Sequence, residues 1–152
     1  VNKLYERAQT GPARKGLIWH TQGSGKSLTM VYATLKLRAH LTSKELSSPN
    51  ILVLTDRVDL DDQISKTFVD CGLPNPTQIG SLRDLQTALR QKTHGLVLLS
   101  TIQKFEGSKT ALEDSENWIV LVDECHRTQE KDLGAYLRAT LPQARFFGFT
   151  GT

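Results

Sequence analysis

A glycine-rich stretch that joins an apolar run to a helix-forming segment constrains this chain more than any other feature. It reads His-Thr-Gln-Gly-Ser-Gly-Lys-Ser over residues 20–27 and directly follows the apolar run Leu17–Trp19. Glycine adopts backbone angles that other residues resist and lets a ligand approach the backbone amides closely. Amides at the start of a helix, together with the positive end of the helix dipole, favour a polyphosphate. The pattern therefore predicts a short buried strand, a phosphate-binding turn and a helix that begins near Lys26.

The residue types in this stretch suit a nucleotide bound with Mg²⁺. Lys26 is expected to reach the terminal phosphates, and the Ser27 hydroxyl is expected to complete the coordination of the metal ion. The expected nucleotide-binding residues are Gln22, Gly23, Ser24, Gly25, Lys26, Ser27 and Leu28. An ordinary Gly-Ser loop is the structural alternative, and the Gly-Lys-Ser triplet at the strand-to-helix junction disfavours it. A dinucleotide fingerprint is disfavoured because Leu28 occupies its third glycine position.

Apolar runs alternate with segments of helical periodicity along the chain. Strands are expected at Leu17–Trp19, Ile51–Thr55, Thr77–Ile79, Gly95–Ser100, Trp118–Val122 and Arg145–Phe149. Helices are expected at Val1–Gln9, Lys26 to about His40, Val58–Val69, Leu82–Gln91 with Ser81 as N-cap, and Leu133–Leu141. Trp19 and Trp118 are expected in the core, and Thr42–Asn50 and Glu106–Asn117 are expected to be polar loops. This alternation predicts an α/β fold in which a mainly parallel sheet lies between two helical layers.

An acid pair, Asp123 and Glu124, directly follows the apolar run Trp118–Val122. In parallel sheets, ligands bind beyond the carboxyl ends of the strands, and each polar cluster of this sequence lies at such an end. Asp123 is expected to hold Mg²⁺, directly or through water, because hard cations prefer carboxylate oxygens. Glu124 would polarise the attacking water. A strand that leaves the core into solvated acids is the structural alternative, and the phosphate loop upstream disfavours it.

Composition sets broader limits. The chain has 152 residues, of which 38% are hydrophobic, and this suits one domain with one core. Nineteen Lys and Arg against 16 Asp and Glu give a net charge of +3, which permits a nucleic-acid partner without requiring one. The longest apolar runs have the length of strands, so no membrane partner is expected. The chain begins with Val rather than Met and stops at Thr152 within a strand-end motif, so we expect it to be a piece of a longer protein.

Taken in order, these motifs resemble the first RecA-like domain of superfamily 2 helicases and translocases. The similar segments are residues 20–27 (motif I, with His20 in place of the usual Ala or Gly), 52–63 (motif Ia), 100–103 (motif Ib), 123–126 (a DECH form of the DEAD/DEAH box) and 149–152 (motif III). Within that superfamily, the phrases Gly16–Met30, Asp123–Arg127 and Phe147–Thr152 resemble the restriction (R) subunit of type I restriction-modification enzymes. The resemblance covers nearly the whole chain.

The resemblance implies an ATP-dependent motor on double-stranded DNA, with ATP and Mg²⁺ as ligands. It implies catalytic roles for Lys26, Asp123, Glu124 and His126, with Ser27 and Asp123 as Mg²⁺ ligands. It also implies DNA-backbone contacts from Arg57, Thr101 and Gln103, and coupling through Thr150 and Thr152. For Thr101 and Gln103, helix capping is the structural alternative. The role of His20 stays open.

The parent enzyme is then expected to be an ATP-dependent type I site-specific deoxyribonuclease. It would act with modification (M) and specificity (S) subunits in a bacterial or archaeal cytoplasm. The nuclease domain and a second motor domain, with its arginine finger, are implied to lie outside these 152 residues. Two alternatives remain: another superfamily 2 DNA helicase or remodelling ATPase, and a non-catalytic nucleotide-binding module.

Overall fold

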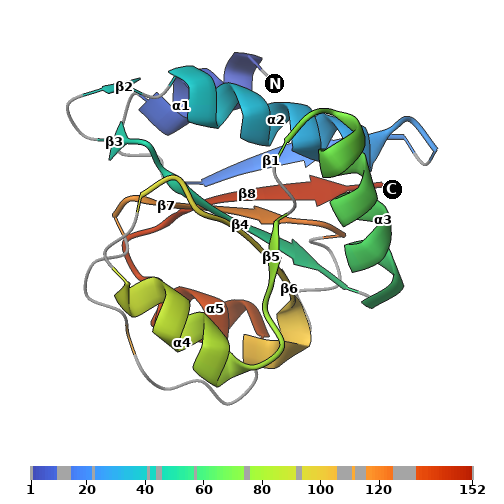
Figure 1. Cartoon of the computed structure of the whole chain (residues 1–152). Helices are drawn as coiled ribbons and strands as arrows, with labels where there is room; N and C mark the ends of the chain where they lie inside the picture. The colour runs from blue at the N-terminus through green and yellow to red at the C-terminus, as the bar shows by residue number, and fades with distance from the viewer. Residues whose placement is uncertain are drawn as a thin grey trace.

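A sheet of six parallel strands forms the centre of the computed structural model (Figure 1). The structure describes residues 2–9, 15–21, 23–40, 42–43, 46–56, 58–73, 76–91, 94–105, 111, 116–124 and 133–151. In spatial order the strands are β1 (Lys15–Trp19), β8 (Arg145–Thr150), β7 (Trp118–Val122), β4 (Asn50–Thr55), β6 (Val97–Thr101) and β5 (Thr77–Gln78). The predicted parallel sheet is therefore confirmed, and each predicted strand is present within one or two residues of its expected ends.

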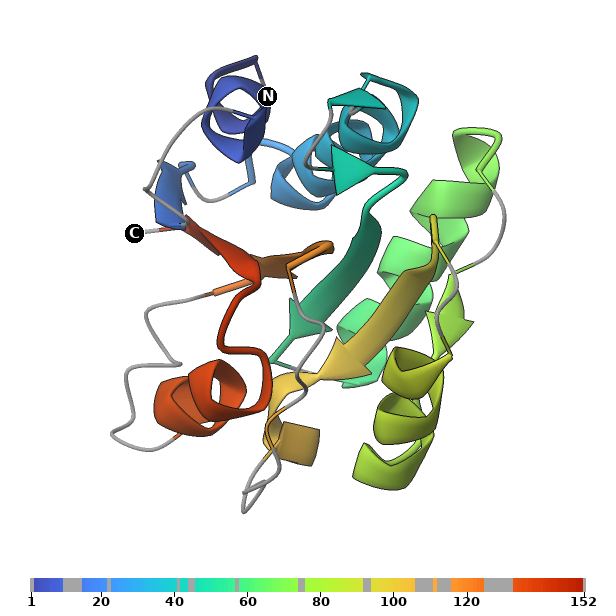
Figure 2. The same ribbon diagram turned by 90° about the vertical axis from the view of Figure 1, so that its left-hand side faces the viewer.

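Helices cover both faces of this sheet (Figure 2). One face carries α1 (Asn2–Gln9), α2 (Lys26–His40) and α3 (Val58–Asp70), and the other carries α4 (Leu82–Arg90), α5 (Leu133–Thr140) and the short 3₁₀ helix η1 (Ile102–Phe105). The predicted N-cap of α4 is confirmed, since the Ser81 hydroxyl accepts a hydrogen bond from the Asp84 amide at 3.2 Å. The three-layer α/β architecture predicted from the alternation of elements is the one observed.

A separate apolar core lies on each face of the sheet. The helical residues Leu4, Met30 and Phe68 are among those buried on the first face. Leu85, Phe105 and Leu137 are among those buried on the second face. All the residues of β4 and β7 are buried, because a central parallel strand is covered on both faces. These two strands form the middle of the sheet.

Strand β1 lies at the edge of the sheet, and its exposure contradicts a prediction. The sequence predicts that this strand is buried and that Trp19 belongs to the core, yet Leu17 is 69% exposed and Trp19 is 63% exposed. Trp118, the other tryptophan predicted in the core, is 3% exposed as expected. The reason for the difference is position, because β1 pairs with β8 alone whereas β7 pairs with β8 and β4. An edge strand has a neighbour on one side only.

The polar segment Thr42–Asn50 is not simply the loop that the sequence predicts. It contains two short antiparallel strands, β2 (Thr42–Ser43) and β3 (Leu46–Ser47), and Asn50 already belongs to β4. Apart from Pro49, Leu46 is the one apolar residue of this segment, so the segment lacks the apolar pattern from which strands are predicted. The other expected loop, residues 106–117, lies mostly outside the described residues.

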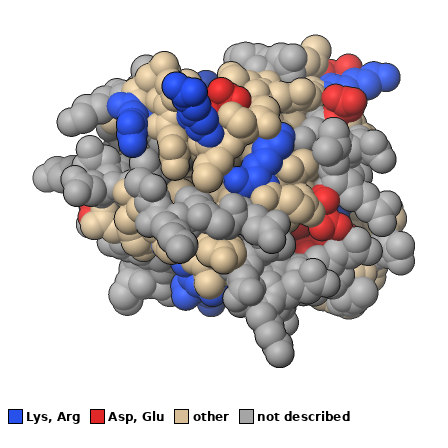
Figure 3. Space-filling model, turned by 90° about the horizontal axis from the view of Figure 1, so that it is seen from below, with Lys and Arg blue, Asp and Glu red and all other residues tan. Residues whose placement is uncertain are grey.

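The described charged side chains are dispersed on one face of the molecule. On the face that carries α4 and α5, the described Lys and Arg side chains lie in separate groups with uncharged and acidic residues between them (Figure 3). None of the helices within the described residues combines the length and the apolar character that crossing a bilayer requires.

Candidate functional site

The strand order brings together polar segments that are far apart in the sequence. Three adjacent strands bring their carboxyl ends together at one edge of the sheet. These ends are the loop after β1, the end of β8 at Thr150 with Gly151 after it, and Asp123–Glu124 after β7. Asp56 after β4 and Gln103 after β6 continue the same edge. In open parallel sheets this edge is where ligands bind. The candidate site is therefore built from strand ends, as the sequence predicts.

The loop after β1 is an open cradle. Gly23 and Gly25 both have a φ of +79°, the left-handed region that glycine adopts without strain. A Cβ atom built at Gly23 would meet nothing within 4 Å, so this part of the loop faces open space. The Thr29 amide donates to the Gly25 carbonyl at 2.9 Å, and the helix begins at Lys26 as predicted. The first amides of α2 therefore lie at the mouth of the cradle, where a phosphate would bind.

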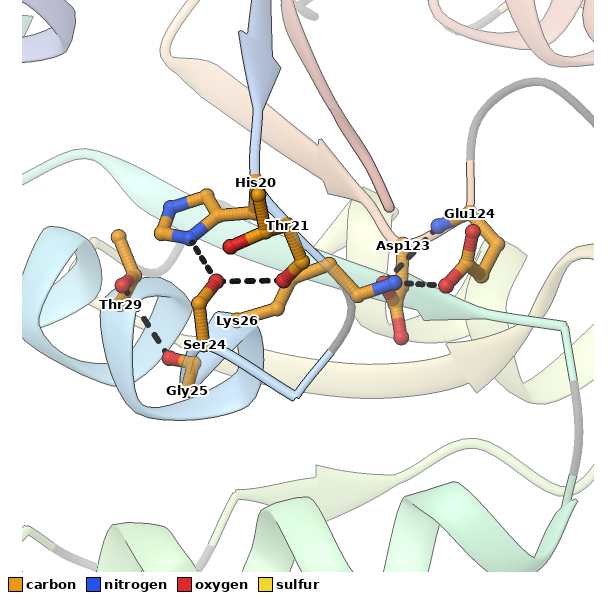
Figure 4. A network of polar contacts seen from close by, with 8 residues as sticks. All are labelled: His20, Thr21, Ser24, Gly25, Lys26, Thr29, Asp123 and Glu124. Atoms are coloured by element: carbon orange, nitrogen blue, oxygen red, sulfur yellow. Dashed lines mark hydrogen bonds and ion pairs between the residues drawn. The ribbon is translucent and has the colours of Figure 1, made fainter. Parts of the chain in front are cut away.

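Side-chain contacts close the base of this loop (Figure 4). The Ser24 amide donates to the Thr21 carbonyl at 3.1 Å, and the Ser24 hydroxyl donates to the same carbonyl at 2.6 Å. His20 Nδ1 lies 3.0 Å from the Ser24 hydroxyl. The His20 amide donates to the Thr150 carbonyl of β8 at 2.9 Å, so the start of the loop is attached to the neighbouring strand.

The acid pair is held by the backbone of the central strands. The Asp123 amide donates to the Leu54 carbonyl at 2.8 Å, which extends the β7–β4 ladder by one residue and leaves Asp123 4% exposed. Glu124 has a φ of +49°, a left-handed conformation that costs a non-glycine residue about 1–2 kcal/mol. Its amide donates to Asp123 Oδ1 at 2.9 Å. Such backbone outliers cluster at functional sites, where the surrounding structure enforces them.

Lys26 joins the loop to the acid pair. Its Nζ lies 3.0 Å from Asp123 Oδ1 and donates a hydrogen bond to Glu124 Oε1 (Figure 4). Burial by itself would lower the pKa of Lys26, but hydrogen bonds and charge attraction from the two carboxylates outweigh it and raise the pKa above its ordinary value. Lys26 is therefore firmly cationic at neutral pH, and its side chain is 17% exposed. A firmly held ammonium group of this kind suits the binding of a phosphate.

Gly151 lies within the segment 149–152 that resembles motif III, but no role in the site was predicted for it from the sequence. A Cβ atom at this position would lie 3.4 Å from Glu124 Oε1 and 3.6 Å from Lys26 Nζ, so the backbone after β8 lies against this ion pair. The signal in the sequence is a glycine placed directly after an apolar strand. Thr150, which the sequence predicts to couple nucleotide state to movement, is 7% exposed and is attached to His20 through its carbonyl.

The arrangement fits a polyphosphate bound with a hard cation. The cradle offers open backbone amides beside a cationic Lys26, which suits an anion. The Ser27 hydroxyl and the carboxylates of Asp123 and Glu124 are oxygen donors, the kind that Mg²⁺ prefers. Ser27 is half-buried at the second position of α2, whereas Leu28 is 43% exposed. The phosphate-binding groups and the metal-ligand oxygens predicted from the sequence thus lie together at the carboxyl ends of the strands.

Two of the predicted DNA-contact residues, Thr101 and Gln103, lie along the remaining part of this edge. Gln103 is exposed, and its Nε2 donates to the Asp56 carbonyl at 3.0 Å and lies 3.3 Å from Asp56 Oδ1. Thr101 is 4% exposed, so its burial does not favour direct contact between its side chain and a nucleic acid. Four further predicted site residues, Gln22, Arg57, His126 and Thr152, lie outside the described residues. Their predicted roles stay predictions.

Comparison with known sequences covers the whole chain. A family model described as SWI2/SNF2 ATPase matches residues 1–152. The type I restriction enzyme HindI endonuclease subunit of Haemophilus influenzae is 38% identical over 169 aligned positions, which cover 98% of this chain and 16% of the relative. The type I restriction enzyme SsaAORF53P endonuclease subunit of Staphylococcus saprophyticus is 32% identical over 158 positions, which cover 100% of this chain and 16% of the relative. The chain thus spans about a sixth of the length of these relatives.

Comparison with solved structures concerns the fold. The UvsW helicase from bacteriophage T4 superposes with a TM-score of 0.62 at 22% sequence identity. The superposition covers 92% of this chain and 47% of the helicase. At this level of identity the likeness shows that the two chains share a fold, and it agrees with the RecA-like architecture predicted from the sequence.

Proposed function

This chain belongs to the SWI2/SNF2 ATPase family, and on this basis we propose that it is the nucleotide-binding motor domain of a type I restriction enzyme R subunit. In this proposal the domain couples ATP hydrolysis to movement along double-stranded DNA. The observation that supports it best is the convergence of Lys26, Asp123 and Glu124 beside an open glycine cradle, across 98 positions of sequence. The relatives named as endonuclease subunits of type I restriction enzymes support the restriction context.

In the proposed reaction the loop and α2 bind the polyphosphate of ATP. The amides from Gln22 to Leu28 would hold the phosphates, and Lys26 would exchange its carboxylate partners for the terminal phosphates. Because Asp123 and Glu124 already neutralise Lys26, an incoming phosphate competes with them for the same ammonium group. Bound Mg²⁺ would supply charge stabilisation of the phosphates, held by Ser27 and Asp123.

Glu124 is the proposed general base. Its side chain is 26% exposed, so water reaches the carboxylate, whereas Asp123 beside it is buried. This difference in exposure suits a division of roles, in which Asp123 holds the cation and Glu124 orients the attacking water. His126 would link this acid pair to the nucleic acid.

The proposed DNA contacts come from the other part of the edge. Gln103 and Arg57 would contact the phosphodiester backbone, which positions a protein on DNA without reading its sequence. Because Thr101 is buried, we propose that it supports the turn from β6 into η1 beneath Gln103. Thr150 and Thr152 would couple the nucleotide state to movement. The hydrogen bond from the His20 amide to the Thr150 carbonyl, which attaches β8 to the loop after β1, supports this proposal for Thr150.

The rest of the proposal concerns the parent enzyme. We propose that it is an ATP-dependent type I site-specific deoxyribonuclease that works with M and S subunits in a bacterial or archaeal cytoplasm. Cleavage and the arginine finger would come from parts of the protein outside residues 1–152. Because an arginine finger is worth about a thousandfold or more in rate, residues 1–152 alone should hydrolyse ATP slowly.

The nucleotide site is tested by Lys26→Ala in the full-length protein. A charge-assisted contact is worth roughly 1.5–3 kcal/mol, so the affinity for Mg²⁺–ATP should fall at least about tenfold, measured by calorimetry. Lys36→Ala is the matched control, because Lys36 lies on the same helix and contacts Asn2 instead of the acid pair. Equal affinity in wild type and Lys26→Ala would remove Lys26 from the nucleotide site.

The assignment of the general base is tested by Glu124→Gln, which replaces a carboxylate with an amide of the same size. Nucleotide binding should persist while DNA-stimulated phosphate release falls by about a hundredfold or more. Phosphate release near the wild-type rate would contradict this role.

A further inference from the structure

We infer that His20 is a positioning residue that holds the phosphate-binding loop in its open form. This inference rests on the proposed nucleotide site and adds a residue that phosphate chemistry does not require. His20 contacts the loop through its ring and β8 through both its ring and its backbone. It thereby attaches the cradle to the strand that ends beside Lys26 and Glu124.

The hydrogen-bond directions assign one particular form of the ring. The Ser24 hydroxyl has a single hydrogen, and it donates this hydrogen to the Thr21 carbonyl at 2.6 Å. At its 3.0 Å contact with His20 Nδ1, the same hydroxyl must therefore accept. The Nδ1 atom of His20 thus carries a hydrogen and acts as the donor. His20 Nδ1 therefore donates to the Ser24 hydroxyl, which donates to the Thr21 carbonyl. The second of these hydrogen bonds closes the turn that contains Gly23.

The ring is also held from the side of the sheet. It stacks on Phe149 of β8, with ring centroids 6.4 Å apart and planes inclined by 29°. Phe149 is fully buried, so it forms a firm support. The His20 amide donates to Thr150 in the same strand at 2.9 Å. With its backbone bonded to β8 and its ring stacked on Phe149, the His20 side chain directs Nδ1 at Ser24 (Figure 4).

This geometry predicts an effect on binding and a much smaller effect on chemistry. Ser24 lies between Gly23 and Gly25, so its side-chain bond sets the path of the backbone amides that face the phosphate. The His20 ring is directed at Ser24 in the loop, whereas the Lys26 ammonium group is directed at the acid pair (Figure 4). Loss of the Nδ1 donor should therefore raise the KM for ATP and leave kcat near its wild-type value.

The test compares His20→Asn, His20→Gln and His20→Ala in the full-length protein, with Mg²⁺–ATP as ligand. The Asn amide nitrogen can take the place of Nδ1, whereas the Gln amide reaches farther, toward the place of Nε2. His20→Ala and His20→Gln should weaken binding about tenfold, equal to about 1.4 kcal/mol, while His20→Asn stays within about threefold of wild type. Binding by His20→Asn that is as weak as that of His20→Ala would overturn the inference.

Ser24→Ala provides an independent test, because Ser24 is exposed and its replacement does not disturb the core. It should weaken binding as much as His20→Ala, and the double variant should be no weaker than either single one. Wild-type affinity in Ser24→Ala would overturn the inference, and this test remains available if His20→Ala does not fold. Additive losses in the double variant would overturn it as well. His94→Ala is the matched control, because His94 is an exposed histidine whose Nδ1 contacts Asn117. Both residues precede strands, so they lie at the amino ends of the strands, away from the candidate site.

Lys26→Ala separates the two proposals. If Lys26→Ala loses binding and the His20 variants do not, the nucleotide site stands and the role of His20 is wrong. If wild type and Lys26→Ala bind Mg²⁺–ATP equally, the nucleotide site itself is wrong. A fall in kcat in His20→Ala with an unchanged KM would contradict a positioning role.

Discussion

Strands β1 and β7 each end in one part of the candidate site, and β8 lies between them. β7 has paired neighbours on both sides and is buried along its whole length, whereas β1 has a single neighbour and alternates between exposed and half-buried residues. The acids after β7 are therefore placed by the backbone ladder, through the bond from the Asp123 amide to Leu54. The loop after β1 has a backbone bond of the same kind, from the His20 amide to the Thr150 carbonyl, and side-chain contacts of His20, Ser24 and Phe149 are added to it. A central strand positions the residues after it by pairing, and an edge strand needs additional contacts.

The largest expected effect distinguishes the two strands by their tryptophans. Trp118→Ala should lower the free energy of unfolding by about 3–5 kcal/mol, because Trp118 is 3% exposed and packs in the core beneath β7. Trp19→Ala should cost less than about 1 kcal/mol, because this side chain is 63% exposed. Urea denaturation of both variants measures the difference. Equal losses would show that the edge strand is enclosed as firmly as the central one.

A smaller effect concerns the close approach of β1 to β8. A Cβ atom at Gly16 would lie 2.7 Å from Phe147 Cδ1, and the Phe147 ring is 1% exposed and cannot move aside freely. Gly16→Ala should therefore lower the free energy of unfolding by about 1–3 kcal/mol. A Gly16→Ala, Phe147→Leu double variant should partly relieve the clash. Its loss in free energy of unfolding should therefore be smaller than the sum of the losses of the two single variants. Strictly additive losses would show that an alanine at position 16 fits beside Phe147 without a clash.

The smallest effect concerns the pH dependence of the ion pair that joins the two parts. Contacts with Glu124 and Asp123 raise the pKa of Lys26 above its ordinary value of 10.5 in the folded chain. This contribution to stability is fully present below pH 10.5, and it is lost as the pH rises through the folded-state pKa. Between these values the unfolded chain releases a proton that the folded chain retains.

Wild type should therefore lose stability at alkaline pH faster than Lys26→Met does, by at most about 1.4 kcal/mol per pH unit for one proton. Guanidinium denaturation at intervals between neutral and strongly alkaline pH measures this difference. Parallel curves for the two proteins would show that Lys26 gains nothing from the acid pair.

Most elements could be predicted because their signals are local. The apolar runs of β4 and β7 contain no polar interruption. The N-cap Ser81 lies three residues before Asp84 and accepts a hydrogen bond from the Asp84 amide. η1 was not predicted because it is a single short turn, and β2 and β3 were not predicted because the polar segment that contains them lacks an apolar pattern. The burial of Trp19 was predicted wrongly, because the apolar run Leu17–Trp19 does not reveal how many neighbours its strand has. Sequence patterns thus predict the helices and strands better than they predict how deeply each one is buried.

Local sequence is sufficient to specify the strand, glycine turn and helix around Lys26, and the acids at the end of an apolar run. Each of these depends on backbone preferences and on residues close together in the chain. Tertiary structure is needed to establish that β8 lies between β1 and β7, that Lys26 meets Glu124 across 98 positions, and that Gly151 lies against both. It also brings His20 into contact with Ser24 and Phe149. Strand order and side-chain contact arise from pairing and packing between distant segments, which no local pattern encodes.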